Sequence, residues 1–149
     1  MKKYSKQGGF TLIEILVVIG IIAILAAVVI VALNPARQFA QARNTQRSSN
    51  VNTILNAVGQ RMIDSRGIWN STCGASVVTL PAAATEIGSN LNLVNLAPCL
   101  APTYLLSVPF DPSTGSDAAT SYHIWQDAGG RIHVTAPGAE LTETIGVAR

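Results

Sequence analysis

A single carboxylate, Glu14, lies inside the longest apolar run of the chain. The run extends over residues 10–33, and Glu14 is its only charged side chain. A carboxylate in a membrane-spanning helix costs up to a few kcal/mol, about 2.5–3.5 at the helix centre on insertion scales. Such a cost indicates a function for the charge, because an unpaired charge in apolar surroundings is strongly unfavourable.

The leader before the apolar run is short and basic. Residues 1–9 hold every lysine of the chain and no acid. By the positive-inside rule, these lysines keep the N-terminus in the cytoplasm, so the C-terminal part is translocated. A helix over the apolar run would span roughly 36 Å, enough for a bilayer. An ordinary secretory signal fits poorly, because its apolar stretch has about 7–15 residues and is followed by its cleavage site.

Two cysteines, Cys73 and Cys99, lie beyond the apolar run. Neither belongs to a CxxC motif or to a Cys/His metal pattern. In a translocated domain we expect them to form a disulfide, with two buried free thiols as the alternative.

Two histidines, His123 and His133, flank a predicted turn at residues 127–130. In a hairpin with an even number of loop residues, the residue numbers of two directly paired positions add up to an odd number. Paired side chains lie on one face, and side chains alternate between faces along each strand. Positions 123 and 133 add up to an even number, so such a loop puts the two histidines on opposite faces. This argues against a shared metal ion. No serine or cysteine nucleophile stands in a recognisable motif beside them, so we expect no enzymatic activity.

Three aspartates, Asp111, Asp117 and Asp127, lie around a loop rich in Gly, Ser and Thr. Calcium prefers oxygen ligands of this kind. No EF-hand spacing is present, and loop aspartates usually form Asx turns. We therefore expect no cofactor, with calcium as a minor alternative.

The charge distribution argues against nucleic acid as a partner. Without the leader, seven arginines face eight carboxylates, whereas phosphate binding needs a clustered basic face. Arg37, Arg43 and Arg47 form a small cluster just after the apolar run. We expect them to form a solvated helix face or to contact lipid headgroups.

One long helix is expected to position the N-terminal residues. Asn34-Pro35 interrupts the apolar run, but helical periodicity resumes afterwards. A single helix face carries five apolar residues: Val51, Ile54, Leu55, Val58 and Met62. We expect a helix from Thr11 to Asp64, kinked near the proline, with Gly67 in its C-cap region. The amphipathic half, residues 34–66, needs a domain to cover its apolar stripe.

That covering domain is expected over residues 67–149, with long loops. The strongest signal in it is a hairpin over residues 121–136, with Trp125, Ile132 and Val134 in its core. Weaker strand or turn signals occur at residues 77–80, 102–106 and 145–149. The expected fold class is α+β, a long N-terminal helix packed on a small antiparallel sheet.

The first 35 residues resemble bacterial type IV pilins and type II secretion pseudopilins. The resemblance rests on Lys2-Lys3, on the GGFTLIE motif at residues 8–14, and on the apolar helix that follows. Residues 42–47 and the turn at residues 108–112 also resemble major pseudopilins. The resemblance implies the type IV pilin fold.

The resemblance also implies roles for three positions. A prepilin peptidase would cut between Gly9 and Phe10, and Phe10 would become the N-methylated terminus. Glu14 would then meet the N-terminal amine of a neighbouring subunit. Such an amine, with a pKa of about 7.7–8.0, is cationic at neutral pH. A charge pair in an apolar core would fix the stagger between subunits.

The expected function is therefore that of a structural subunit of a type IV pilus. The chain would be made as a single-pass prepilin in the cytoplasmic membrane and polymerised with identical copies by an inner-membrane assembly platform. Its final place would be an extracellular pilus. One alternative is a pseudopilin in a periplasmic pseudopilus. The other is a binding domain that keeps its helix in the membrane as an anchor.

Overall fold

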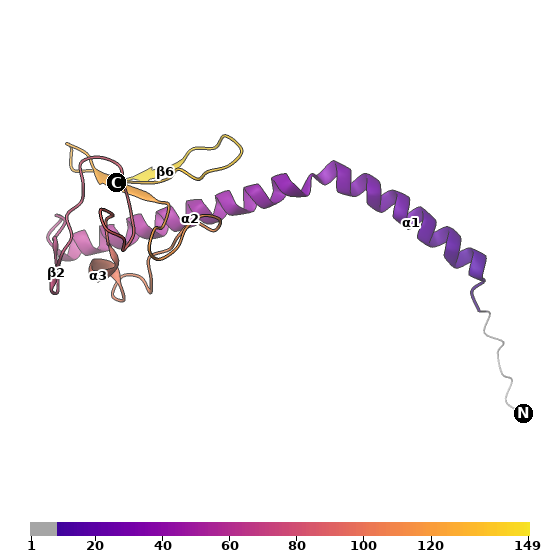
Figure 1. Cartoon of the computed structure of the whole chain (residues 1–149), viewed down its shortest axis with the longest axis horizontal. Helices are drawn as coiled ribbons and strands as arrows, with labels where there is room; N and C mark the ends of the chain where they lie inside the picture. The colour runs from indigo at the N-terminus through magenta and orange to yellow at the C-terminus, as the bar shows by residue number, and fades with distance from the viewer. Residues whose placement is uncertain (1–8) are drawn as a thin grey trace, which may run out of the picture. The chain divides into compact units, whose positions relative to one another are not determined.

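The computed structural model describes residues 9–149, so the predicted leader lies outside the described residues except for Gly9. The fold class is α+β, as predicted from the sequence. The chain divides into two compact units between Gln38 and Phe39. Figure 1 shows the elements in chain order: α1 (Leu12–Leu33), α2 (Pro35–Asp64), β1 (Thr72–Cys73), β2 (Ser76–Val77), β3 (Thr85–Glu86), α3 (Ala97–Leu100), β4 (His123–Gln126), β5 (Ile132–Ala136) and β6 (Ile145–Ala148).

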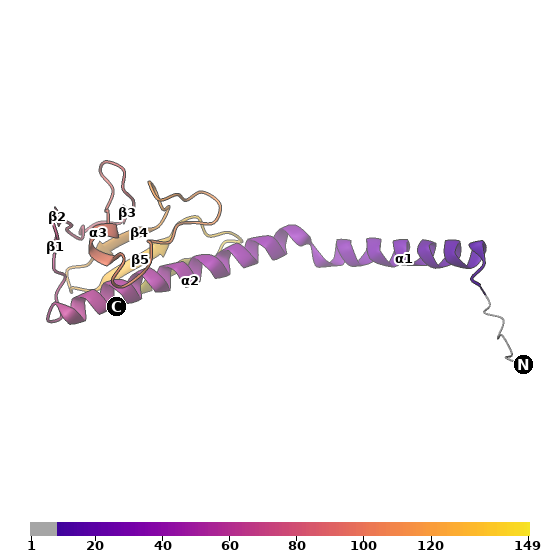
Figure 2. The same ribbon diagram turned by 90° about the horizontal axis from the view of Figure 1, so that it is seen from below.

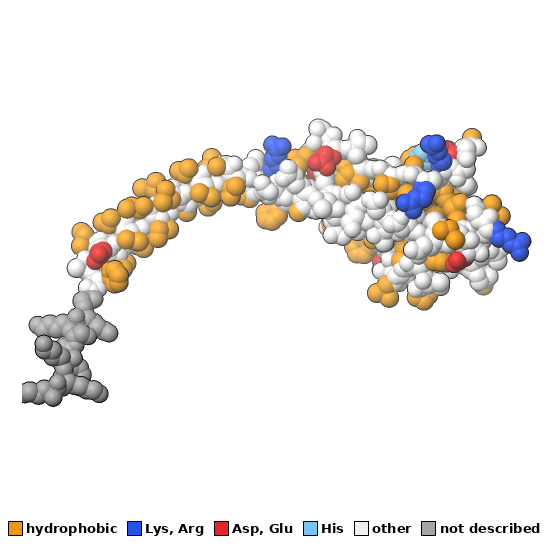
Figure 3. Space-filling model, turned by 180° about the vertical axis from the view of Figure 1, so that it is seen from behind, with side chains coloured by type: hydrophobic (Ala, Val, Ile, Leu, Met, Phe, Trp, Pro, Cys, Tyr) orange, Lys and Arg blue, Asp and Glu red, His pale blue; other side chains and the backbone are white. Residues whose placement is uncertain are grey.

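The first unit consists of α1 and the residues around it. The helix has 22 residues, and none of them is buried within the described chain. Apolar side chains cover its visible face in Figure 3. A helix that is apolar all round needs an apolar environment, either a membrane or other helices. Its length and composition make α1 a candidate membrane anchor near the N-terminus.

A single residue, Asn34, separates α1 from α2. The expected continuous, kinked helix is therefore wrong in this detail. The residue before a proline is disfavoured in the α region, and Asn34 is left-handed with φ 41°. Its carbonyl accepts from Arg37 N at 3.0 Å and from Gln38 N at 3.4 Å. Asn34 thus ends one helix and caps the next, with Pro35 at the first position of α2, where no backbone N–H is needed.

The second unit packs the sheet against α2. Strands β3–β4–β5–β6 form an antiparallel sheet in that order, and β1 and β2 form a separate small hairpin. Figure 2 shows the sheet lying along α2. The predicted stripe of α2 is confirmed: Val51, Ile54 and Val58 are fully buried. They share one core with Ile124 of β4 and Val134 of β5. The sheet therefore covers the apolar stripe of α2.

The end of α2 is a Schellman-type turn. Gly67 N donates to Met62 O at 2.7 Å, and Arg66 N donates to Ile63 O at 3.2 Å. The prediction of a C-cap near Gly67 is confirmed, although Arg66 also adopts a left-handed conformation, with φ 63°.

The hairpin of β4 and β5 is confirmed, but its register differs from the expected one. Gln126 pairs with Ile132, so five residues, an odd number, lie between the strands. The Asp127 carboxylate accepts from Gly129 N and Arg131 N, each at 2.9 Å, and this bonding holds the longer turn. Consequently, the residue numbers of directly paired positions add up to an even number, which reverses the assignment of faces expected from the sequence.

The odd loop length puts the side chains of His123 and Trp125 on the face of the sheet opposite to the expected one. His123 and His133 lie on the same face of the sheet, which corrects the parity argument from the sequence. Trp125 pairs with His133 on that face and stacks on it at 4.8 Å between ring centroids. The prediction that Trp125 lies in the core is therefore wrong, whereas Ile132 and Val134 do lie there.

The weaker strand and turn signals agree with the structure only in part. Strand β6 lies within the predicted range 145–149. Strand β2 ends at Val77, so it covers only the beginning of the predicted range 77–80. The expected helical turn at residues 102–106 is displaced, because α3 forms earlier over Ala97–Leu100. Asn95 Oδ1 accepts from Ala97 N at 3.2 Å, which forms an Asx-type turn just before this short helix. A turn of this kind gives no periodic signal in the sequence.

Cys73 in β1 and Cys99 in α3 are joined by a disulfide, with 4.8 Å between their Cα atoms. The bridge ties the small hairpin to the layer of loops that covers the core. Both cysteines are themselves part of the buried core. The elements joined here are short, with two residues in β1 and four in α3, so the covalent link adds to the few contacts between them.

We predict that replacing both cysteines with alanine lowers the free energy of unfolding by about 3.5 kcal/mol on the chain-entropy model, given their separation of 26 residues. Denaturant titration of the purified protein measures this loss. Alkylation provides the control: the native protein should take up no alkyl group, and the reduced protein two. Two reactive thiols before reduction would contradict the bridge.

Candidate processing and assembly site

The predicted cleavage junction, Gly9–Phe10, lies just outside α1. Thr11 is the N-cap, with extended backbone at φ −81° and ψ 151°, so the junction precedes the first helical residue. Both junction residues are exposed, and Phe10 is 80% exposed. A Cβ atom added at Gly9 would meet nothing within 4 Å. The junction is therefore accessible from outside the described chain.

Glu14 occupies the first turn of the helix that begins at this junction. Its backbone N–H donates to Thr11 Oγ1 at 3.2 Å. The pair has the Thr-x-x-Glu spacing of a capping box. A carboxylate in the first turn interacts favourably with the helix dipole by about 0.3–1 kcal/mol. The sequence analysis missed this role of Glu14 in the first helical turn, although the spacing of Thr11 and Glu14 predicts it.

The helix dipole offsets only part of the cost of Glu14 in apolar surroundings. The ion pairs found in residues 9–149 involve other side chains, and none of them includes Glu14. The Glu14 side chain is exposed among apolar neighbours on α1. Its carboxylate is thus free to receive a cation from outside the described chain.

A second group of charges lies in the second unit, around Arg47 of α2. Arg47 is only 1% exposed. Its Nε donates to Asp111 Oδ2 at 2.6 Å, and its Nη2 donates to Asp111 Oδ1 at 3.2 Å. Its Nη1 donates to Glu140 Oε2 at 2.9 Å. One guanidinium therefore joins two loops to α2 by charge-assisted hydrogen bonds.

The neighbours of Arg47 complete this network. Arg43 forms a bidentate pair with Glu140, with both distances 2.7 Å. Asn44 forms two hydrogen bonds with the backbone of Glu140. Asn44 Nδ2 donates to Glu140 O at 2.8 Å, and Glu140 N donates to Asn44 Oδ1 at 2.9 Å. Among the described residues, no buried side-chain nitrogen or oxygen lacks a partner. We call Arg43, Asn44, Arg47, Asp111 and Glu140 the clamp.

The clamp shifts the pKa values of its charged groups. Burial acts to raise the pKa of Asp111, but hydrogen bonds from Arg47 and Ser113 outweigh it and hold this pKa well below its usual range. The hydrogen bond from Arg43, followed by that from Arg47, lowers the pKa of Glu140 to about 2. The hydrogen bond to Asp111 raises the pKa of Arg47. The arginines and carboxylates of the clamp are therefore charged at neutral pH.

The clamp corrects the expectation that the arginine cluster is solvated. Arg37 is exposed, but Arg43 is half-buried and Arg47 is buried. Arg47 lies on the apolar stripe, four residues before Val51, where a charge is disfavoured unless it is paired. A sequence cannot identify this partner, because Asp111 lies 64 positions away.

The three candidate calcium ligands are not brought together. Asp111 binds Arg47, and Asp117 is exposed. Asp127 Oδ2 lies 2.9 Å from His133 Nε2, on the outer face of the sheet. Within residues 9–149, no three His, Cys, Asp or Glu side chains gather as metal ligands.

Comparison with known families adds evidence for the N-terminal part only. Residues 4–30 match the model of the prokaryotic N-terminal methylation motif. The match contains the Gly9–Phe10 junction, Glu14 and most of α1. No significant match was found among curated proteins or among solved structures.

We predict that Arg47→Met lowers the free energy of unfolding by about 3–5 kcal/mol, because it leaves Asp111 buried without its partner. Denaturant titration of the detergent-solubilised protein measures this change. Arg37→Met, at an exposed position of α2, is the matched control and should change stability by about 0.5 kcal/mol or less. Equal stability of the two variants would refute the role given to the clamp.

Proposed function

We propose that this chain, which carries the prokaryotic N-terminal methylation motif of type IV pilins and pseudopilins over residues 4–30, is the precursor of a type IV pilus subunit. The observation that carries the proposal is Glu14. It is a lone carboxylate in a helix otherwise apolar all round, four residues after an exposed Gly–Phe junction. A structural subunit, rather than an enzyme, uses such a charge to join copies of itself.

The first step of the proposed route takes place in the membrane. Helix α1 anchors the precursor, and the basic leader keeps its N-terminus in the cytoplasm. A prepilin peptidase then cuts between Gly9 and Phe10. The exposure of this junction and the open space around Gly9 support the proposal. The cut creates a cationic amine at Phe10, and the matched motif implies that this amine is then methylated.

The second step is polymerisation through α1. A new amine at the N-terminal end of a helix is disfavoured by the dipole, whereas Glu14 in the first turn is favoured. In a filament, the amine of one subunit can meet Glu14 of its neighbour, and both charges are then paired in apolar surroundings. Little hydrophobic energy is lost when α1 leaves lipid, because the neighbouring helices are equally apolar. The assembly platform of the inner membrane would drive this transfer.

The second unit would coat the outside of the filament. The pairing of Cys73 with Cys99 supports its translocation, since disulfides persist in oxidising compartments. The proposal includes no calcium ion, and Asp111, one of the three candidate ligands, is already paired with Arg47.

The proposal is tested at the cleavage junction. We predict that Gly9→Leu abolishes processing, because a bulky side chain then lies at the scissile bond, while the fold is unchanged. Gly20→Ala is the matched control, since a Cβ there also meets nothing within 4 Å. Mass spectrometry of sheared filaments should find a methylated subunit that begins at Phe10 in the parent and the control.

Other results of the same experiment identify the alternatives. An uncut monomer that stays in the membrane would instead indicate an anchored binding domain. A cut subunit confined to a periplasmic filament would indicate a type II secretion pseudopilin.

The pairing role of Glu14 has its own test. We predict that Glu14→Gln leaves membrane insertion and cleavage intact but lowers filament yield by about a hundredfold or more. The reason is that an unpaired amine in apolar surroundings costs about 3–5 kcal/mol. Glu14→Asp keeps the charge and should retain part of the yield. Normal filaments from Glu14→Gln would refute the pairing.

A further inference from the structure

The loop between β5 and β6, residues 137–144, holds two residues in an unusual conformation. Leu141 and Thr142 have φ values of 57° and 59°, which side chains other than glycine rarely adopt. Such conformations persist only where the surrounding structure enforces them, and they concentrate at functional sites. Leu141 is 41% exposed at this place. Figure 1 shows the loop projecting beyond β6.

The acids on either side of Leu141 are used differently. Glu140 is held by the clamp, through Arg43, Arg47 and Asn44. Glu143 is exposed and belongs to none of the ion pairs within residues 9–149. The clamp thus fixes the base of the loop, and the loop presents an apolar side chain beside a free carboxylate.

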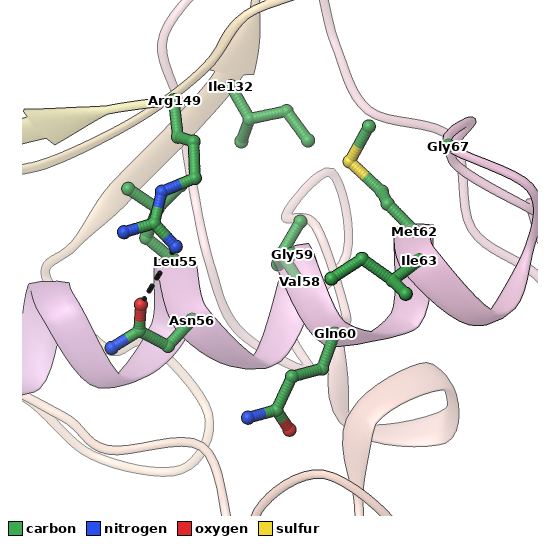
Figure 4. A pocket seen from close by; sticks show the side chains of 10 residues that line it. All are labelled: Leu55, Asn56, Val58, Gly59, Gln60, Met62, Ile63, Gly67, Ile132 and Arg149. Atoms are coloured by element: carbon green, nitrogen blue, oxygen red, sulfur yellow. Dashed lines mark hydrogen bonds between the residues drawn. The ribbon is translucent and has the colours of Figure 1, made fainter.

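An apolar groove of about 400 Å³ lies at the other end of the same unit, where α2 ends. Figure 4 shows its floor at Gly59, between the side chains of Arg149 and Met62, with Ile132 above. A Cβ at Gly59 would meet only the Arg149 guanidinium, at 3.9 Å, so the missing side chain leaves the floor open. Ile63, on the rim, is 76% exposed.

Among the described residues that line the groove, Arg149 is the one cation. Its Nη1 donates to Asn56 Oδ1 at 3.1 Å, on one wall of the groove. Within residues 9–149, Arg149 forms no ion pair with a carboxylate. Figure 3 shows basic side chains exposed at this end of the second unit. None of the described residues that line the groove is acidic.

We propose that the groove receives the β5–β6 loop of a second copy of this chain, with Leu141 against the apolar floor and Glu143 beside Arg149. The complementarity is both apolar and electrostatic, which favours one orientation of the partner. This inference rests on the proposed function, since it names the contact between the outer units of neighbouring subunits.

The loop cannot fill the groove of its own molecule. Asn44, which holds the loop, and Gly59, the floor of the groove, are 15 residues apart on α2, about 22 Å along the helix axis. The contact therefore joins two different surfaces of two copies. A head-to-tail contact of this kind builds an open filament when the rotation between successive copies does not close into a ring.

The test of this contact is disulfide cross-linking between copies in assembled filaments. The full chain carries Leu141→Cys together with Ile63→Cys, and both replaced side chains are exposed. Mild oxidation should produce a ladder of covalent multimers on a non-reducing gel. The matched control pairs Ile63→Cys with Leu106→Cys, at a position 90% exposed but outside the loop, and should give no ladder.

Charge reversal provides the second readout. Glu143→Arg alone and Arg149→Glu alone should each lower filament yield by about fivefold, which corresponds to about 1 kcal/mol per contact. The double variant should restore the yield. Asp117→Arg, at another exposed acid, is the control and should leave the yield unchanged.

The results separate this contact from the proposed function. Filaments whose subunits begin at Phe10 but give no ladder would overturn the contact and leave the pilus function standing. Equal ladders from both cysteine pairs would also overturn it. A parent chain that forms no filament at all would overturn both.

Discussion

A charge removed from water must be paired, and this constraint governs both units of the protein. In the second unit, Arg47 lies on the buried face of α2 and is neutralised by Asp111 and Glu140. In the first unit, Glu14 lies in an apolar helix and has no ion-pair partner in the described chain. Arg47 thus finds its counter-charges inside the molecule. A counter-charge for Glu14 would have to come from another molecule, and the proposed function rests on that difference.

The clamp also explains how a small domain with short strands holds its loops in place. The sheet supplies an apolar face for α2, but its longest strand has five residues. The loops at residues 110–114 and 137–144 lie outside the sheet and receive their position from Arg43, Asn44 and Arg47. A buried ion pair adds little net stability compared with apolar packing, but it is specific about geometry. The β5–β6 loop thereby acquires a defined place, on which the proposed contact between copies depends.

The sequence patterns that succeeded are those that depend on local physics. The stripe of Val51, Ile54 and Val58 and the turn signals of the β4–β5 hairpin predicted the elements that the structure contains. The errors occurred where the conformation or hydrogen bonds of a single residue decided the local structure. The Asp127 carboxylate holds an odd-length loop, which puts His123 and Trp125 on the outer face with His133. Asn34 adopted a left-handed conformation before Pro35, which split the expected single helix.

The sequence by itself determined the apolar helix, its single charge and the glycine–phenylalanine junction before it. These features depend on residue type and order within a few positions, and the match to the methylation motif covers the same residues. Only the tertiary structure decided the partners of Arg47, the exposure of Leu141 and the open floor at Gly59. Each of these depends on residues far apart in the chain. Pairing and burial at such distances are set by how α2 and the sheet pack together, and no local pattern encodes them.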